Sequence, residues 1–84
     1  MYRIYGKVIK EYSFSGVKHI PQKNFRALNK YGSQVTRLAN AFCYNTKEEA
    51  QAVIDRANEN LRRNDHSDCV LFEIRKVWVI ILIK

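Results

Sequence analysis

The chain has 84 residues, of which 46% are hydrophobic and 27% charged, and its formal net charge is +7. We predict one domain over residues 1–84 with a modest core, because a chain this short buries only about 60–65% of its unfolded surface. Such a core excludes most cofactor-dependent enzyme folds, which also need a deep cavity. Ten aromatic residues, with only three glycines and one proline, exclude a disordered chain.

The cysteine content and the hydrophobic pattern indicate in which cellular compartment we expect the protein. Two cysteines, Cys43 and Cys69, are too few for the disulfide framework of a small secreted protein. The first residues show no signal-peptide pattern, so we expect a cytoplasmic protein with free thiols. No stretch approaches the roughly 20 apolar residues of a spanning helix, and we expect no membrane span.

The first strand is predicted over residues 2–9, where apolar and polar residues alternate. One face of this strand carries Tyr2, Ile4, Gly6 and Val8, and the other carries Arg3, Tyr5, Lys7 and Ile9. Over residues 10–24 the sequence predicts an excursion of the chain away from the sheet or an irregular hairpin. Gly16 interrupts a short alternation there, and Pro21 excludes a central strand.

Only short elements are predicted over the next twenty residues. A strand over residues 25–28 leads into a glycine-containing turn at 29–32. We expect a return strand to begin at residues 35–36. One helical turn over residues 37–41 and a short apolar strand over residues 42–44 follow.

The clearest local signal is a helix start. Thr46 and Glu49 form a capping box, in which the Thr46 hydroxyl accepts a hydrogen bond from the Glu49 amide. The helix is predicted to run from about residue 47 to residue 63, with acids near its start and arginines near its end, as the helix dipole favours. Its apolar positions recur at spacings of three and four: Ala50, Val53, Ile54, Ala57 and Leu61.

A second long strand follows a polar loop at residues 64–68. Val70, Phe72 and Ile74 alternate with more polar neighbours and predict a half-buried strand. The predicted fold class is therefore α+β, with one main helix packed on a mostly antiparallel sheet of four to five strands. One helix covers one face of a sheet, so the other face is either exposed to solvent or covered by another molecule.

The apolar run over residues 77–83 is the most unusual feature. It predicts a strand that is paired on at least one side, with Trp78 removed from water. The helix shields one face of that strand, and the other face needs the N-terminal segment or a second chain. We expect a second chain, hence a homodimer, with Trp78, Ile80 and Leu82 at the oligomer interface.

The positive charge is concentrated at the start of the chain. Residues 1–37 carry eight Lys and Arg against one Glu, whereas the remainder is balanced. Phosphates pair with such cations and exposed bases stack on rings, although lysines on a strand can also serve solubility alone. The candidate partner-binding residues are Arg3, Tyr5, Lys7, Lys10, Lys18, Lys23, Arg26, Lys30, Tyr31 and Arg37.

Residue patterns for catalysis or metal binding are weak. The three glycines are isolated and form no phosphate loop. His66 and Cys69 make one loose pair, and Cys43 lacks a nearby second ligand, which falls short of a structural zinc site. The sequence does not indicate that His19 or His66 lies near a nucleophilic side chain. We expect no metal, no cofactor and no enzymatic activity.

The segment from Ala41 through the Thr46-Lys47-Glu48-Glu49-Ala50 helix start to Ile54 resembles small accessory proteins of phages and mobile elements. There, a short strand leads into a Thr-capped helix and a closing strand. This resemblance implies a stoichiometric binder of the anti-CRISPR-like kind and transfers no functional residue.

Three functions stay open. The leading hypothesis is a non-catalytic binding module, a phage-type inhibitor or accessory protein that occupies a host protein or nucleoprotein complex through its basic, aromatic N-terminal face. The alternatives are a direct RNA- or DNA-binding protein and a structural subunit that oligomerises through its last strand. Dependence of affinity on salt distinguishes the first two.

Overall fold

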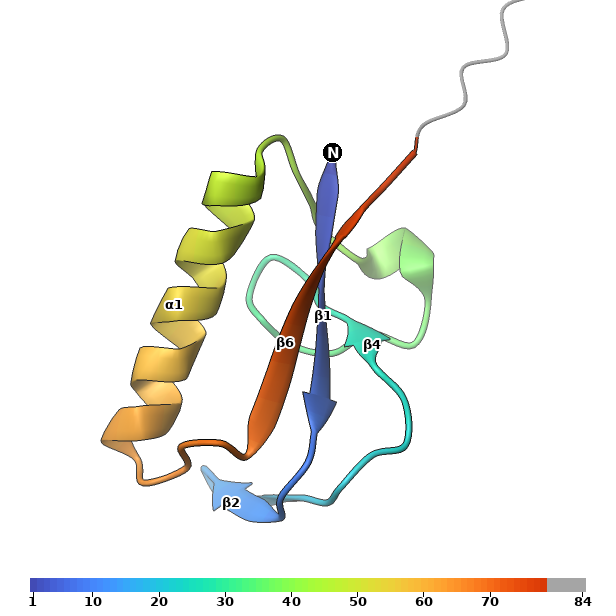
Figure 1. The fold of residues 1–84 in the computed structure, drawn as a ribbon. Coiled ribbons are helices and arrows are strands. Elements are labelled where there is room, and N and C mark those ends of the chain that lie inside the picture. Colours follow the sequence, from blue (N-terminus) through green and yellow to red (C-terminus); the bar gives the residue numbers. More distant parts are fainter. Residues whose placement is uncertain (79–84) are drawn as a thin grey trace, which may run out of the picture.

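The computed structural model describes residues 1–78 (Figure 1). Positions Ile80 and Leu82 of the predicted oligomer interface lie outside the described residues. The elements in chain order are β1 (Tyr2–Val8), β2 (Tyr12–Phe14), β3 (Val17–His19), β4 (Arg26–Ala27), the 3-10 helix η1 (Leu38–Asn40), β5 (Cys43–Tyr44), α1 (Lys47–Arg63) and β6 (Val70–Lys76).

The main sheet is built around β1. On one edge, β6 pairs antiparallel along the whole strand, from Tyr2↔Lys76 to Val8↔Val70. On the other edge, β4 and β5 pair antiparallel with different parts of β1. These four strands and the single long helix confirm the predicted α+β class.

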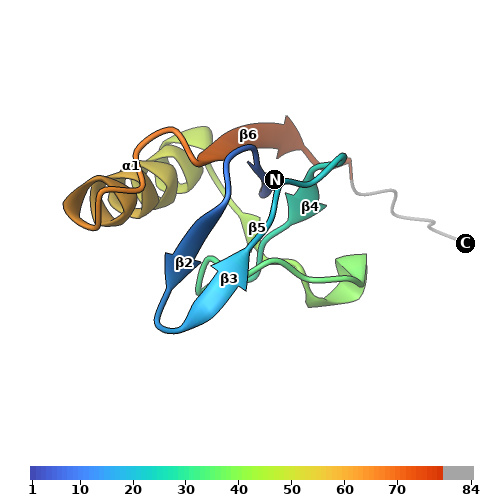
Figure 2. The same ribbon diagram turned by 90° about the horizontal axis from the view of Figure 1, so that it is seen from below.

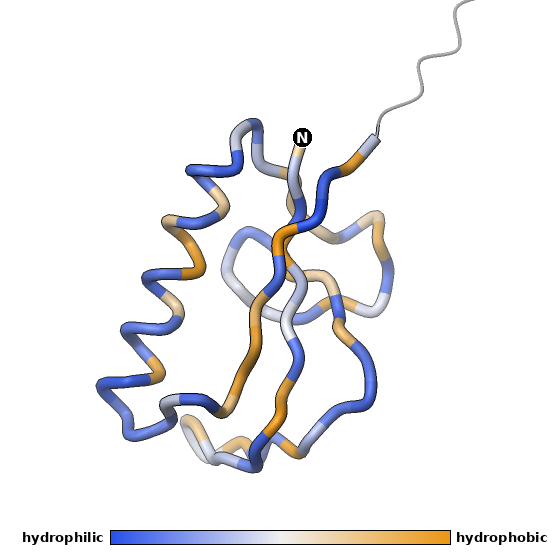
Figure 3. The backbone as a smooth tube through the Cα atoms, in the orientation of Figure 1, coloured by the Kyte–Doolittle hydropathy of each residue, from blue (hydrophilic) through white to orange (hydrophobic). Residues whose placement is uncertain are grey.

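The helix begins and ends where the sequence predicts. Thr46 is the N-cap, and its hydroxyl accepts a hydrogen bond of 3.1 Å from the Glu49 amide. Ala50 and Ile54 of α1 are buried. They pack with Ile4 of β1 and with Leu28 and Tyr44, while Tyr2, Val53, Phe72 and Ile74 pack around this cluster. The hydrophobic positions of α1 turn mainly toward the sheet (Figure 3).

The end of α1 is closed by two backbone hydrogen bonds. The His66 amide donates to the Leu61 carbonyl (2.8 Å), and the Asp65 amide donates to the Arg62 carbonyl (3.2 Å). This pair of bonds is the Schellman arrangement, which places one residue in the left-handed region. Asp65 fills that position with φ +59° although glycine is the usual residue there.

Residues 10–24 contain a hairpin, which is one of the two arrangements that the sequence predicts. Strands β2 and β3 pair antiparallel in a separate two-stranded sheet (Figure 2), and β2 lies below the end of β1 in the view of Figure 1. The two residues of its turn, Ser15 and Gly16, both have positive φ (+51° and +78°). That combination matches the twist of a tight hairpin.

The predicted return strand at residues 35–36 is wrong. Leu28 and Gln34 form only an isolated bridge. The chain returns beside β4 only briefly, where the Val35 amide donates to the Ala27 carbonyl (2.9 Å) and the Asn29 amide donates to the Ser33 carbonyl (2.8 Å). Glutamine side chains satisfy part of the edge of β1 beyond β4: Gln34 Nε2 donates to the Gly6 carbonyl (2.9 Å), and Gln22 Oε1 accepts from the Val8 amide (3.0 Å). The two amide groups also exchange hydrogen bonds of 2.7 Å with each other.

The predicted C-terminal strand over residues 77–83 is not present at residues 77–78, the part of it that the structure describes. β6 ends at Lys76, and the Val77 amide makes one further hydrogen bond to the Met1 carbonyl (2.8 Å). The prediction that Trp78 is buried is wrong for the single chain, because this side chain is 77% exposed. Residues 1–78 therefore place no covering element over it. No helix within this range has both the length and the apolar character to cross a membrane.

Candidate functional site

The face of the sheet turned away from α1 carries a cluster of cations and rings, which we call the open face. Because Ile4 points to the helix side, its neighbours Arg3 and Tyr5 point to the opposite side. The β1–β6 register sets Arg3 opposite Arg75 and Tyr5 opposite Glu73. We define the open face by Arg3, Tyr5, Lys7, Phe25, Glu73 and Arg75.

Arg75 lies at the centre of the open face. Its guanidinium carbon is 4.1 Å from the centroid of the Tyr5 ring and 5.6 Å from that of Phe25. Its Nε and Nη2 donate to the Glu73 carboxylate at 3.2 and 2.9 Å. The side chain is still 46% exposed. The ring and the carboxylate therefore hold the guanidinium in one orientation while part of it stays open to solvent.

Arg3 has weaker partners. Its Nη1 donates to the Tyr5 hydroxyl at 3.3 Å and its Nη2 lies 3.8 Å from the Cys43 sulfur. Its Nε is buried and has no hydrogen-bond partner within residues 1–78. The hydrogen bond to Tyr5 raises the pKa of Arg3 above its usual value, against the opposing effect of burial. Arg3 is thus a permanent cation without a carboxylate partner in this part of the chain.

The electrostatic balance of the open face is positive. Arg3, Lys7 and Arg75 oppose the single carboxylate of Glu73, an excess of two positive charges. Arg3 and Arg75 are direct cross-strand neighbours. Like charges in this position destabilise a sheet by about 0.2–1 kcal/mol. An anion between them relieves that repulsion, and guanidinium groups bind carboxylates and phosphates in bidentate fashion.

The predicted partner-binding residues do not form one surface. Of these, Arg3, Tyr5 and Lys7 meet on the open face, where Lys7 Nζ is 5.8 Å from the Phe25 centroid. Arg26 lies on β4, opposite Gly6. The others lie outside the four-stranded sheet: Lys10 follows β1, Lys18 is on β3 of the small sheet, Lys23 precedes β4, Lys30 and Tyr31 are in the turn after β4, and Arg37 precedes η1.

Two of the outlying sites are also locally engaged. Lys18 forms an ion pair of 2.7 Å with Glu11 at the hairpin. Lys30 Nζ lies 5.1 Å from the centroid of Tyr31, which is 79% exposed. Sequence reasoning missed Arg75, Glu73 and Phe25. The alternation over residues 70–75 was the available signal, because it sets Glu73 and Arg75 on the polar side of β6.

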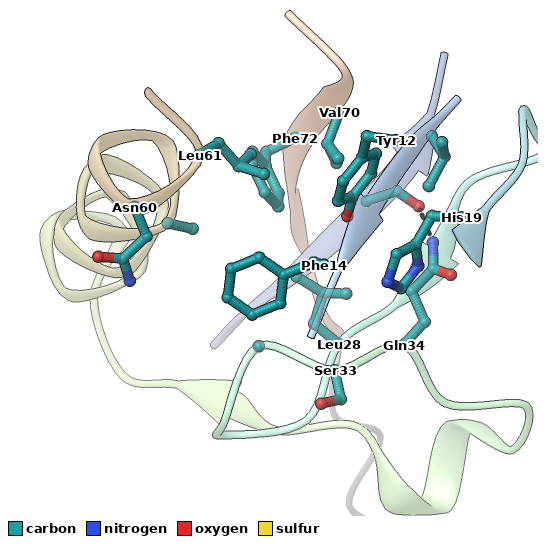
Figure 4. A pocket seen from close by; sticks show the side chains of 14 residues that line it. Tyr12, Phe14, His19, Leu28, Ser33, Gln34, Asn60, Leu61, Val70 and Phe72 are labelled. Carbon is teal, nitrogen blue, oxygen red and sulfur yellow. Dashed lines mark hydrogen bonds between the residues drawn. The ribbon is translucent and has the colours of Figure 1, made fainter. Parts of the chain in front are cut away.

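A cleft lies on the helix side of the sheet, opposite the open face. Its volume is about 520 Å³. Side chains from the end of α1, from β6 and from the β2–β3 hairpin surround it (Figure 4), among them Leu61, Phe72 and Phe14. Phe14 is 46% exposed, so the hairpin closes only part of the gap that the helix leaves. The alanine-rich helix face explains this, since it covers little of the sheet.

The two histidines meet on one ring. Tyr12 stacks on His19 with ring centroids 4.6 Å apart, and it lies at 5.0 Å from His66. Burial, and secondarily Cys69, raise the pKa of Tyr12 above its usual value. Cys43 and Cys69 are free thiols. Within residues 1–78, no three His, Cys, Asp or Glu side chains come together in an arrangement that holds a metal ion.

Comparisons with known proteins return no relative. No protein-family model, no curated protein and no solved structure matches this chain. The resemblance of residues 41–54 to accessory proteins of phages and mobile elements therefore stays a prediction.

Proposed function

We propose that the protein is a non-catalytic binding module that occupies a negatively charged surface of its partner through the open face. The observation that carries this proposal is the direct cross-strand pair of Arg3 and Arg75, with Tyr5 in contact with both. Two arginines in directly opposite positions destabilise a sheet, but they offer an anionic partner two guanidinium groups at one place.

The orientation of Arg75 supports the proposal further. Its contacts with Tyr5 and Glu73 restrict the guanidinium before any partner binds. Less side-chain entropy is then lost on association, which favours binding. Lys7 extends the positive field along β1.

The chemistry of the open face favours an anionic partner surface, and the resemblance of residues 41–54 implies the kind of protein. We propose a phage-type inhibitor or accessory protein that acts on a host protein or nucleoprotein complex by covering an anionic surface. The cytoplasm suits such a role, since the thiols of Cys43 and Cys69 are free.

Heparin chromatography with charge-matched variants tests the location of anion binding. Arg3→Gln with Arg75→Gln removes two charges from the open face. Lys47→Gln with Arg56→Gln removes two charges from exposed positions of α1. We expect the open-face variant to elute at clearly lower salt than the helix variant and the parent. Equal elution of the two variants contradicts the proposal, because net charge alone then governs binding.

A structural subunit is the second candidate. β6 pairs only with β1 within the described chain, so its outer edge is open, and Trp78 beyond it is exposed. Light scattering distinguishes the candidates: a dimer that Trp78→Ser converts to a monomer supports a subunit, and a monomeric parent contradicts it.

A further inference from the structure

We infer that the open face binds single-stranded nucleic acid, with a base stacked on Arg75 and phosphates held by Arg3 and Lys7. This inference rests on the proposed function and specifies the partner of the same face. It follows from three features, namely a planar stacking group, cations on either side of it, and its position on an extended strand.

The planar group is the Arg75 guanidinium, which lies 4.1 Å from the centroid of the Tyr5 ring. Glu73 fixes its edge with two hydrogen bonds. Bases stack on guanidinium planes and on aromatic rings, whatever their sequence. A base on the exposed side of Arg75 completes a stack of base, guanidinium and ring. The side chains of an acidic peptide have no comparable planar surface, so they leave this arrangement unused.

The cations flank the stacking position along one strand. Arg3 and Lys7 lie two residues before and two residues after Tyr5 on the same face of β1. Each is therefore about 6.5–7 Å from Tyr5 along the strand. A nucleic-acid backbone that runs along β1 meets a cation before and after the stacked base. Arg3 has no carboxylate partner within residues 1–78, since its terminal nitrogens meet the Tyr5 hydroxyl and the Cys43 sulfur, so its positive charge can attract a phosphate.

Stacking requires an unpaired base, which separates single strands from duplexes. In a duplex both faces of each base are covered by its neighbours, and only phosphates and groove edges reach a sheet surface. The open face then contributes only its charge. We therefore expect weaker binding of a duplex than of a single strand of equal length.

Fluorescence anisotropy with defined probes tests the inference. The probes are fluorescein-labelled 12-nucleotide oligo(dT) and oligo(U), a 12-base-pair DNA duplex and a 12-residue polyglutamate peptide. We expect the single strands to bind at least tenfold more tightly than polyglutamate. The affinity should fall with salt at a log–log slope near −1.4, given about −0.7 for each of the two phosphates that Arg3 and Lys7 neutralise.

The variants separate stacking from charge. Arg75→Lys keeps the charge and loses the plane, and Tyr5→Leu loses the ring. Each should weaken oligo(dT) binding about tenfold, the loss of one stacked base. Tyr5→Phe keeps the ring but loses the hydroxyl that accepts a hydrogen bond from Arg3, so it should bind more tightly than Tyr5→Leu. Arg3→Gln should make the salt slope shallower by about 0.7. Circular dichroism confirms that each variant is folded, and Arg75→Lys tests stacking even if Tyr5→Leu unfolds.

Different results distinguish the inference from the proposed function. Parent-like oligo(dT) binding by Arg75→Lys overturns the stacking arrangement. Equal or tighter binding of polyglutamate, or no binding of single strands, overturns the nucleic-acid inference. These results do not contradict the proposed function if the Arg3→Gln, Arg75→Gln variant elutes from heparin at lower salt than the helix variant. Binding of no probe, together with unchanged heparin elution of that variant, overturns both.

Discussion

Gly6 offers a substitution whose effect is opposite to that of most changes in a small core. It lies buried in the middle of β1. A Cβ atom there meets Leu28 Cδ2 at 3.5 Å and Phe72 Cδ1 and Cε1 at 3.6 Å. These are ordinary van der Waals distances, so Gly6→Ala adds contacts without a clash.

Two terms set the expected magnitude. Alanine in a strand interior is favoured over glycine by about 0.5–1 kcal/mol. One additional buried methyl group contributes up to about 0.8 kcal/mol. We expect Gly6→Ala to raise the free energy of unfolding by about 1–1.5 kcal/mol, which for a domain of this size is an increase in Tm of about 5–10 °C.

Gly32→Ala is the matched control. Gly32 has φ +84°, so a methyl group there strains the backbone even though no atom lies within 4 Å of the Cβ position. We expect a loss of about 1 kcal/mol. Urea unfolding of both variants, followed by circular dichroism, gives the two changes. A loss of more than about 1 kcal/mol for Gly6→Ala would refute the packing described between β1, Leu28 and Phe72.

Four further outcomes are expected. Thr46→Ala should lower the free energy of unfolding by about 0.5–2 kcal/mol through the lost cap, with heparin elution unchanged. Ile54→Asp should unfold the domain by circular dichroism, because it places an unpaired charge between helix and sheet; a folded variant would show that α1 packs on another face. Asp65→Gly should raise Tm, since glycine adopts the left-handed region without strain; a lower Tm would mean that the aspartate itself stabilises the turn. The raised pKa of Tyr12 favours its neutral form in the folded state, so stability should fall as pH rises above about 10. Tyr12→Phe should lose part of that alkaline decrease in urea titrations at pH 9 and 11, and an identical decrease would assign it to other groups.

The position of the open face has a consequence for mutagenesis. Arg3 and Arg75 project from the same two strands whose opposite side forms the core with Ile4 and Ile74. We therefore expect changes on the open face to affect the proposed binding through groups that the core does not use. Variants of Ile4 or Ile74 test stability, and variants of Arg3 or Arg75 test partner binding.

Local signals were sufficient for the long helix and for the first strand. The cap at Thr46 and the three- and four-residue spacing predicted α1 at residues 47–63, because capping and helix periodicity depend on neighbours within a few residues. The alternation over residues 2–9 likewise predicted β1 and how its side chains divide between two faces. It therefore placed Arg3, Tyr5 and Lys7 on one side of a strand.

Only the tertiary structure decided which strands are neighbours. Arg75 meets Tyr5 and opposes Arg3 because β6 pairs with β1 in one register, and that register depends on packing against α1 rather than on residues near Arg75 in sequence. The predicted return strand is reduced to a bridge between Leu28 and Gln34. The side chains of Gln22 and Gln34 satisfy part of the edge of β1, and no local pattern reveals a hydrogen bond from a side chain so distant in sequence.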